Sequence, residues 1–305
     1  MPSERSPNLA ANLAAQLAQH RAALGDRPFE FEHGLHGDAR FARGQLAELV
    51  GRVPCAWVLA HEAQFSPHER RGKAKLPADA DLVQAIVTLP TAGVSIRAYN
   101  LEHTTDFRPL LDELTPIVRD FVGDREGGLS EVNLATFLAS AGAVTAAHPD
   151  RHHNLLLNVD GRKEVWVDTD PDTRGHHVRT LDYFRRPDLG APELPPAEQF
   201  VLEPGQGVYI PPYRWHWTRV LDDCATGFSV GFSTATTDRN NRVLGFDMRL
   251  RALGVRPRPF DMHGDGGVTG RVKAGLSPVV ARAARLRPRR GGSLVVSGDP
   301  QEVAR

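Results

Sequence analysis

Hydrophobic and polar positions alternate in short runs through the middle of the chain, from about residue 130 to residue 236. The runs are LATFLA, the segment around HPD, HHVRTLDYF, GVYIP, WHWTRVL and TGFSVGFST, and turns rich in glycine and proline separate them. A period of two indicates β-strands, and many short strands favour a sandwich or a barrel over βαβ units. The middle of the chain is therefore predicted to be mainly β.

Helical periodicity appears on both sides of this β region. Residues 8–24, 41–53 and 107–122 carry apolar side chains at helical spacing, so each stretch predicts a helix. CAWVLA and VSIRAYNL, which lie between these stretches, predict two further strands. After the β region, residues 241–254 (NRVLGFDMRLRALG) predict a last helix.

These patterns divide the chain into four segments. Residues 1–95 are expected to be a mixed, partly helical elaboration packed on the core, and residues 96–236 are expected to be the β core itself. Residues 237–284 are expected to be helical. Residues 285–305 are rich in Arg, Gly and Pro and lack a core pattern, which predicts a disordered tail. The charged, turn-rich residues 68–82 predict an exposed loop.

Composition excludes several classes of protein. Lys and Arg together number 37, as do Asp and Glu, so the formal net charge is zero and gives no electrostatic reason to bind nucleic acid. The two cysteines, Cys55 and Cys224, are too few for a disulfide scaffold and fit a reducing cytoplasm. No apolar run predicts a signal peptide or a membrane span. We therefore expect a cytoplasmic protein with neither a nucleic-acid nor a membrane partner.

The candidate chemistry is concentrated in HPDRHHNLLLNVDGRK, residues 148–163. His148 and Asp150 are spaced i, i+2, which on an extended strand points both side chains to one face. His216, in the later motif IPPYRWHW, offers a second imidazole. Two imidazoles and one carboxylate can hold Fe(II) and leave three coordination positions open. Alone, however, an HxD motif can equally be a polar pair at a strand end.

The turn after this motif suggests which side chains share its face. Asp160 and Gly161 are a strong signal for a two-residue type I′ hairpin, in which Asn158 would pair with Lys163. The period of two would then carry this face back through Asn154 to the HPD motif. A buried lysine requires an anionic partner, and a dicarboxylate bound to the metal would provide one. The other interpretation of Lys163 is an ordinary surface lysine in a hairpin.

The same run resembles the JmjC-type and cupin-like 2-oxoglutarate oxygenases, especially the hypoxia-inducible-factor asparaginyl hydroxylase and its bacterial cupin-like relatives. That family has a Thr three residues before the first His ligand, an Asn six after it and a Lys fifteen after it. Thr145, Asn154 and Lys163 stand at these distances from His148. The resemblance implies that Lys163 and Thr145 bind the far carboxylate of 2-oxoglutarate.

The likeness continues through PGQGVYIPPYRWHW, which is similar to the family's strand pair that carries the second His ligand. Two positions depart from the family pattern. Gln206 stands where an Asp is common, and Gly231 stands where the asparaginyl hydroxylase has another pocket Asn. The first change concerns a turn, whereas the second concerns contacts with co-substrate or substrate.

The resemblance implies a double-stranded β-helix, the jelly roll of cupins and JmjC domains, with flanking helices. It further implies Fe(II) held by His148, Asp150 and His216, 2-oxoglutarate as co-substrate, and O2. Tyr99 lies on a strand where related oxygenases place a pocket tyrosine, and Ser229 belongs to a small-residue face that leaves room for a ligand. Together with Asn154, they complete the predicted co-substrate contacts. The implied reaction is hydroxylation of an unactivated C–H bond, with a peptide or protein side chain as the leading substrate.

Alternatives stay open at this point. The substrate could instead be a free amino acid or a natural-product intermediate. A zinc or manganese cupin of other chemistry would not need Lys163, and a non-catalytic sensor would bind a small acid without turnover. The helix over residues 241–254 places Val243, Phe246, Leu250 and Leu253 at helical spacing, and we expect it to form a homodimer.

Overall fold

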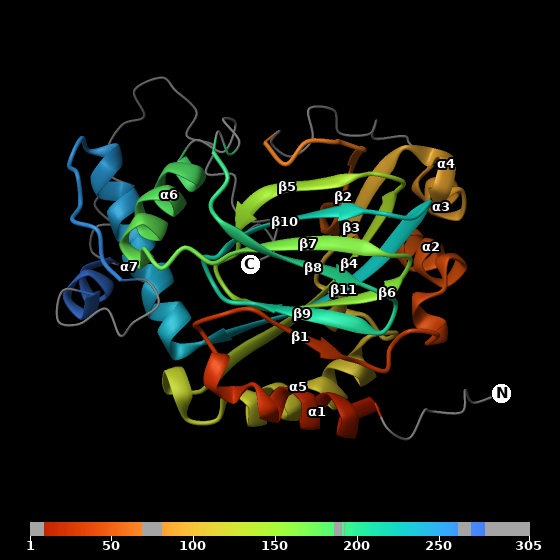
Figure 1. Ribbon diagram of the computed structural model, residues 1–305, viewed down its shortest axis with the longest axis horizontal. Helices are drawn as coiled ribbons and strands as arrows, with labels where there is room; N and C mark the ends of the chain where they lie inside the picture. Colours follow the sequence, from red (N-terminus) through yellow and green to blue (C-terminus); the bar gives the residue numbers. More distant parts are fainter. Residues whose placement is uncertain (1–8, 69–80, 186–190, 192, 262–269, 278–305) are drawn as a thin grey trace.

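A computed structural model describes residues 9–68, 81–185, 191, 193–261 and 270–277 of the 305-residue chain (Figure 1). The strands of this part form two antiparallel sheets, with the orders β1-β9-β6-β11-β4-β3-β2 and β5-β10-β7-β8. The larger sheet contains β1 (Phe29–Glu32), β2 (Val58–Glu62), β3 (Val94–Ala98), β4 (Leu129–Ser140), β6 (His153–Asp160), β9 (Gln206–Ile210) and β11 (Cys224–Thr234). The smaller sheet contains β5 (Val144–Pro149), β7 (Lys163–Asp168), β8 (Ala197–Leu202) and β10 (Trp215–Val220).

The connections between β4 and β11 define the architecture. The chain passes from one sheet to the other after β4, β5, β6, β8, β9 and β10, so that the order β9-β6-β11-β4 faces the order β8-β7-β10-β5. Eight strands that alternate in this way between two sheets form a jelly roll, the double-stranded β-helix. The predicted fold class, mainly β with flanking helices, is confirmed.

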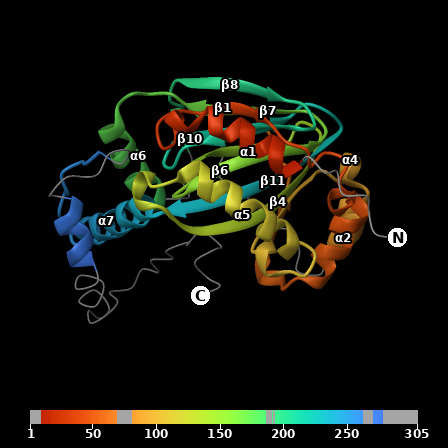
Figure 2. The same ribbon diagram turned by 90° about the horizontal axis from the view of Figure 1, so that it is seen from below.

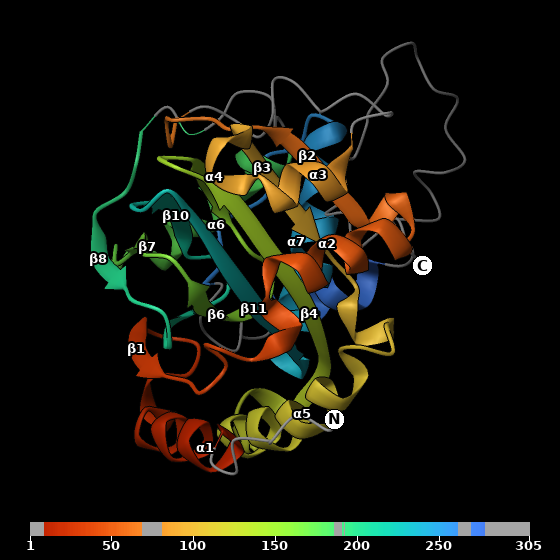
Figure 3. The same cartoon turned by 90° about the vertical axis from the view of Figure 1, so that its right-hand side faces the viewer.

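Helices cover the outer side of the larger sheet and one end of the molecule. Figure 2 shows α1 and α5 side by side across the underside, and Figure 3 shows α2, α3 and α4 on the side away from the smaller sheet. At the other end, α6 and α7 lie together (Figure 1). The helices are α1 (Leu9–Gln19), α2 (Arg43–Arg52), α3 (Leu82–Val87), α4 (Leu89–Ala92), α5 (Arg108–Val122), α6 (Thr173–Arg185) and α7 (Ala235–Ala252).

Strand β6 shows how the sequence pattern follows from this layering. Leu155 and Leu157 belong to the large apolar core beneath the helices, whereas Leu156 packs between the sheets with Val165 and Phe200. Both faces of a central strand are therefore covered, which explains why LLL runs without a polar break. The N-terminal strands extend this sheet, because β1 pairs with β9 while β3 pairs with β4.

The strand predicted from HHVRTLDYF is wrong, because this segment lies within helix α6. Its buried positions include His176, His177, Thr180 and Leu181, which recur with a helical period. The Nε2 atom of His176 lies 3.2 Å from Asp168 Oδ2, and the Nε2 atom of His177 lies 3.1 Å from Asp247 Oδ2. All four side chains are buried. The inner face of this helix is thus largely polar, so an analysis of apolar periodicity does not detect it.

The predicted C-terminal helix is present as α7, which begins earlier than expected, at a capping box formed by Thr234 and Thr237. Val243 is fully buried with Leu181 and Phe260 of the same chain, while Leu253 is 48% exposed. Much of the apolar surface proposed for a dimer therefore packs within one chain. The homodimer stays a prediction, which light scattering would test.

Two other predictions fall largely or wholly outside the described residues, namely the loop over residues 68–82 and the tail over residues 285–305. The division of the chain into domains also stays a prediction. Among the described helices, none combines the length and the apolar character needed to cross a membrane.

Candidate metal centre and co-substrate pocket

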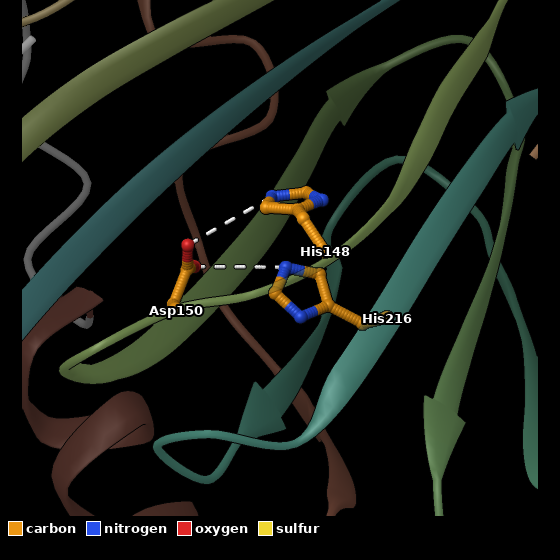
Figure 4. A group of neighbouring side chains, drawn as sticks. All are labelled: His148, Asp150 and His216. Carbon is orange, nitrogen blue, oxygen red and sulfur yellow. Dashed lines mark ion pairs between the residues drawn. The ribbon is translucent and has the colours of Figure 1, made fainter. Parts of the chain in front are cut away.

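The HPD and WHW motifs meet between the two sheets. His148 on β5 pairs directly with His216 on β10, and Asp150 follows the end of β5. The Nε2 atom of His148 lies 3.8 Å from Asp150 Oδ1, and the Nε2 atom of His216 lies 3.6 Å from Asp150 Oδ2 (Figure 4). One ligand atom from each residue lies within 4.8 Å of the others, as a shared metal ion requires. In the described part of the chain this is the one such group.

Backbone carbonyl groups set the tautomer of both imidazoles. The Nδ1 atom of His148 lies 2.8 Å from the carbonyl oxygen of Ala146, and the Nδ1 atom of His216 lies 3.1 Å from that of Arg214. A carbonyl oxygen only accepts hydrogen bonds, so Nδ1 must carry the proton in each neutral ring. Each Nε2 therefore keeps its lone pair and points it toward the carboxylate, which is the arrangement that metal-binding histidines require.

Both the backbone and the side chain of Asp150 are held in place. The N–H of Tyr213 donates to the Asp150 carbonyl oxygen at 2.7 Å, and Tyr213 has a φ of 65°. Such a conformation is strained for tyrosine, and a hydrogen bond from its buried hydroxyl to Asn241 at 2.8 Å helps to hold it. The Asp150 carboxylate accepts a hydrogen bond from Asn154 at 3.3 Å, and Asn154 accepts one from Ser229 at 2.7 Å.

The hairpin predicted at Asp160 and Gly161 is wrong. Strands β6 and β7 belong to different sheets, so Asp160 pairs with Thr226 on β11, and Lys163 pairs with Val220 on β10. Lys163 still points toward the pocket, since the inner faces of both sheets line it. Lys163 thus lines the same pocket as the predicted metal ligands, but the strand pairing used to place it there is wrong.

The pocket brings together every residue that the sequence singled out for the site. Its lining includes His148, Asp150, His216, Lys163, Thr145, Asn154, Tyr99 and Ser229. His152 lines it as well, whereas His153 faces the helices and contacts Tyr209 and Glu126. The metal ligands lie at one end of the pocket, and Lys163, at the start of β7, lies at the other end.

Asn133 and Arg97 are two of the lining residues that were not predicted. Asn133 on β4 pairs with Gly231, where a Cβ atom would collide with the Asn133 side-chain oxygen and lie 2.9 Å from His152. The amide missing at position 231 is therefore supplied by the neighbouring strand. Arg97 on β3 is only 5% exposed, and its Nη2 donates to Thr145 Oγ1 at 3.5 Å. Its position two residues before Tyr99 was the available signal, because i and i+2 share a strand face.

The far end of the pocket is electropositive. Lys163 is 5% exposed, and burial, followed by the charge of Arg97, lowers the pKa of its ammonium group from 10.5 to about 8. Gly227 on β11 makes room for this group, because a Cβ atom there would lie 2.8 Å from Lys163 Nζ. The pocket therefore combines a carboxylate and two imidazoles at one end with two cations at the other.

Comparison with known proteins gives this arrangement a context. Residues 121–239 match the family model of the JmjC domain. The chain is 30% identical over 112 residues to Jumonji C domain-containing protein 5 of Drosophila melanogaster, and this alignment covers 33% of this chain and 27% of that protein. It is 30% identical over 131 residues to the lysine-specific demethylase JMJ30 of Arabidopsis thaliana, and this alignment covers 37% of this chain and 30% of the relative. The chain thus spans less than a third of the length of these curated relatives.

Among solved structures, the chain is similar to the Escherichia coli ribosomal oxygenase YcfD in complex with cobalt and 2-oxoglutarate. The identity is 18%, the TM-score is 0.47, and the match covers 92% of this chain and 61% of YcfD. A second YcfD structure matches with 16% identity and a TM-score of 0.44, covering 87% of this chain and 65% of the other.

Proposed function

We propose that this chain, whose residues 121–239 match the family model of the JmjC domain, is an Fe(II)- and 2-oxoglutarate-dependent oxygenase that acts on a peptide or protein side chain. The observation that carries the proposal is the pairing of two features in one pocket. His148, Asp150 and His216 offer a complete set of metal ligands, and Lys163 lies buried in the same lining without an ion pair to any described residue. A metal-bound dicarboxylate would complement both features.

The donor set fits Fe(II). Two imidazole nitrogens and one carboxylate are the ligands of the facial triad, which leaves positions open for co-substrate and oxygen. Bound Fe(II) with 2-oxoglutarate and O2 would supply the oxidising power to convert a C–H bond to C–OH, with succinate and carbon dioxide as the other products. The chain's own residues bind, orient and shield these groups.

Each remaining residue of the site has a distinct proposed task. Lys163 binds the far carboxylate of 2-oxoglutarate through a charge-assisted hydrogen bond, with Thr145 and Tyr99 as further donors. Asn154 and Ser229 orient the Asp150 carboxylate through the hydrogen bonds described above. In this proposal Asn154 contacts the metal ligand directly, and Ser229 acts on it through Asn154.

The charges of the pocket favour hydroxylation of an uncharged side chain over demethylation. Among the described residues that line it, Asp150 is the one carboxylate, and a metal ion would neutralise it. A methylated lysine is cationic and would find no further carboxylate among these lining residues. Asn133 and His152 instead offer hydrogen-bonding groups. The name of one curated relative, the lysine-specific demethylase JMJ30, supports a protein substrate.

An assay of 2-oxoglutarate turnover tests the proposal. Iron-loaded protein should convert 2-oxoglutarate slowly to succinate, and the correct substrate should accelerate this and gain one oxygen atom. Parallel panels of unmodified peptides, methyl-lysine peptides and free amino acids separate the candidate substrates. Formaldehyde release from methyl-lysine peptides would indicate demethylation. If only free amino acids accelerate 2-oxoglutarate turnover, a peptide or protein substrate is excluded. Iron-loaded protein that forms no succinate with any panel would favour a sensor.

A further inference from the structure

We propose that Arg97 is a second cationic anchor for the far carboxylate of the co-substrate, so that Arg97 and Lys163 hold this carboxylate jointly. The inference rests on the proposed function, because it concerns the same pocket. It goes beyond that function in assigning a specificity-determining role to a strand outside the eight strands of the jelly roll. Arg97 lies on β3, which the N-terminal half of the chain adds to the edge of β4.

The position of Arg97 connects it to the proposed carboxylate site. Its side chain is 5% exposed and lines the pocket together with Tyr99, which follows directly after β3. The guanidinium carbon lies 6.0 Å from the centre of the Phe137 ring, and Nη2 donates to Thr145 Oγ1. Thr145 is one of the residues proposed to bind the carboxylate, so a ligand that reaches this hydroxyl also reaches the guanidinium group.

The charges are the second line of support. Neither Arg97 nor Lys163 forms an ion pair with another residue in the described part of the chain, although both are buried. The pocket's carboxylate, Asp150, is already engaged with His148, His216 and Asn154. Two adjacent buried cations without a counter-ion are unfavourable, and an anionic ligand would remove this penalty.

The geometry of the ligand suits two cations. An ionised carboxylate has two oxygens and about four acceptor positions, and the guanidinium group offers a fork of donors where an ammonium group acts as a point charge. Lys163 and Arg97 can therefore bind the same carboxylate without competing for one lone pair. The low pKa of Lys163, caused partly by Arg97, is consistent with two positive groups facing one space.

Ligand binding to the full chain loaded with Mn(II), measured by calorimetry without oxygen, tests this assignment. The ligands are 2-oxoglutarate, glutarate, which lacks the keto group, and 2-oxopentanoate, which lacks the far carboxylate. Arg97→Gln should weaken binding of 2-oxoglutarate and glutarate about tenfold or more, since one charge-assisted contact is lost. Its affinity for 2-oxopentanoate should stay within about twofold of wild type. Arg97→Lys should restore part of the affinity for the two diacids.

Arg219→Gln is the matched control, because it removes the same charge from a half-exposed position on β10, a strand of the smaller sheet. Thermal melting of each variant shows whether it is folded. If Arg97→Gln weakens the monoacid as much as the diacids, or weakens neither, Arg97 does not contact the far carboxylate and the assignment is overturned.

The pH dependence of 2-oxoglutarate affinity tests the assignment further, because a purely structural role of Arg97 would not change it. In wild type the affinity for 2-oxoglutarate should fall as the pH rises through about 8, where Lys163 loses its proton. In Arg97→Gln the neighbouring positive charge is absent, so this fall should move to higher pH. The other titratable groups that line the pocket, Tyr99, His148, Asp150, His152 and His216, are the same in both proteins. An unchanged midpoint would contradict the assignment.

The two proposals can fail separately. If Mn(II)-loaded wild type binds 2-oxoglutarate and Arg97→Gln binds it equally well, the oxygenase proposal survives and the Arg97 assignment fails. If wild type binds glutarate but not 2-oxoglutarate, and Arg97→Gln loses glutarate, the two-cation site stands without the oxygenase. If wild type binds neither diacid, the assignment of Arg97 is overturned.

Discussion

The two ends of the pocket are organised differently. At the metal end, His148 and His216 are directly paired on neighbouring strands, and backbone carbonyl groups orient both rings. At the cationic end, Lys163 and Arg97 come from different sheets and are held close together without a counter-ion among the described residues. The metal end is therefore preorganised by backbone hydrogen bonds, whereas the cationic end is held by packing and becomes favourable only when an anion binds.

This contrast predicts the largest effect at the metal ligands. Asp150→Asn should abolish stoichiometric Fe(II) binding and 2-oxoglutarate turnover, because the triad loses its one negative ligand. Metal analysis of the purified protein and succinate formation would measure both. His152→Ala is the matched control, since it removes a pocket imidazole outside the triad and should leave the metal content unchanged. Full metal content in Asp150→Asn would place the metal site elsewhere.

At the cationic end, Lys163→Met should lower the affinity for 2-oxoglutarate at least tenfold while leaving metal binding intact. The reason is the loss of a charge-assisted contact to the far carboxylate, an effect on the order of 2–5 kcal/mol. Calorimetry with Mn(II)-loaded protein measures the affinity, and metal analysis provides the control. Wild-type affinity in this variant would remove Lys163 from the co-substrate site.

The same variant should be more stable than wild type when no ligand is bound. The pKa of Lys163 is about 8 in the folded protein and 10.5 ordinarily, so the unfolded chain binds more protons between these values. The free energy of unfolding therefore rises with pH between about 8 and 10.5. Below pH 8, the buried ammonium group destabilises the folded protein by about 3 kcal/mol. Denaturant unfolding across this pH range should show the rise in wild type and lack it in Lys163→Met.

A smaller effect is expected one step away from the metal. Asn154→Ala removes the hydrogen bond to the Asp150 carboxylate and should weaken metal affinity about tenfold. Ser229→Ala should act less, because it touches Asp150 only through Asn154. Competition with a metal chelator measures both affinities. An effect of Ser229→Ala larger than that of Asn154→Ala would contradict this order.

The smallest effect should come from Gly227, which lies next to the Lys163 ammonium group. In Gly227→Ala the added methyl group would meet Lys163 Nζ, the mobile end of a long side chain, so the ammonium group should shift with little cost in stability. Affinity for 2-oxoglutarate should fall a few-fold, about 1 kcal/mol, and metal binding should not change. Gly44→Ala, where a methyl group would meet nothing within 4 Å, is the control.

Much of the site could be read from the sequence because it is local. Thr145, His148, Asp150, Asn154 and Lys163 lie within one short stretch, and their spacing is a property of the chain itself. The helices α1, α2 and α5 follow from apolar periodicity, and the alternating runs from residue 130 onward follow from strands with a buried face.

What the tertiary structure alone decided concerns which strand lies beside which. Asp160 and Gly161 signal a turn, but a turn does not reveal whether the next strand stays in its sheet, and here it crosses to the other one. Helix α6 was missed because histidine and threonine occupy its inner face, where His176 lies beside the buried carboxylate of Asp168. Arg97 contacts Thr145 only because β3 pairs with β4, beyond the eight strands of the jelly roll. Spacing along a chain is determined by its sequence, whereas contacts between distant strands depend on the packing of the whole core, which no local pattern encodes.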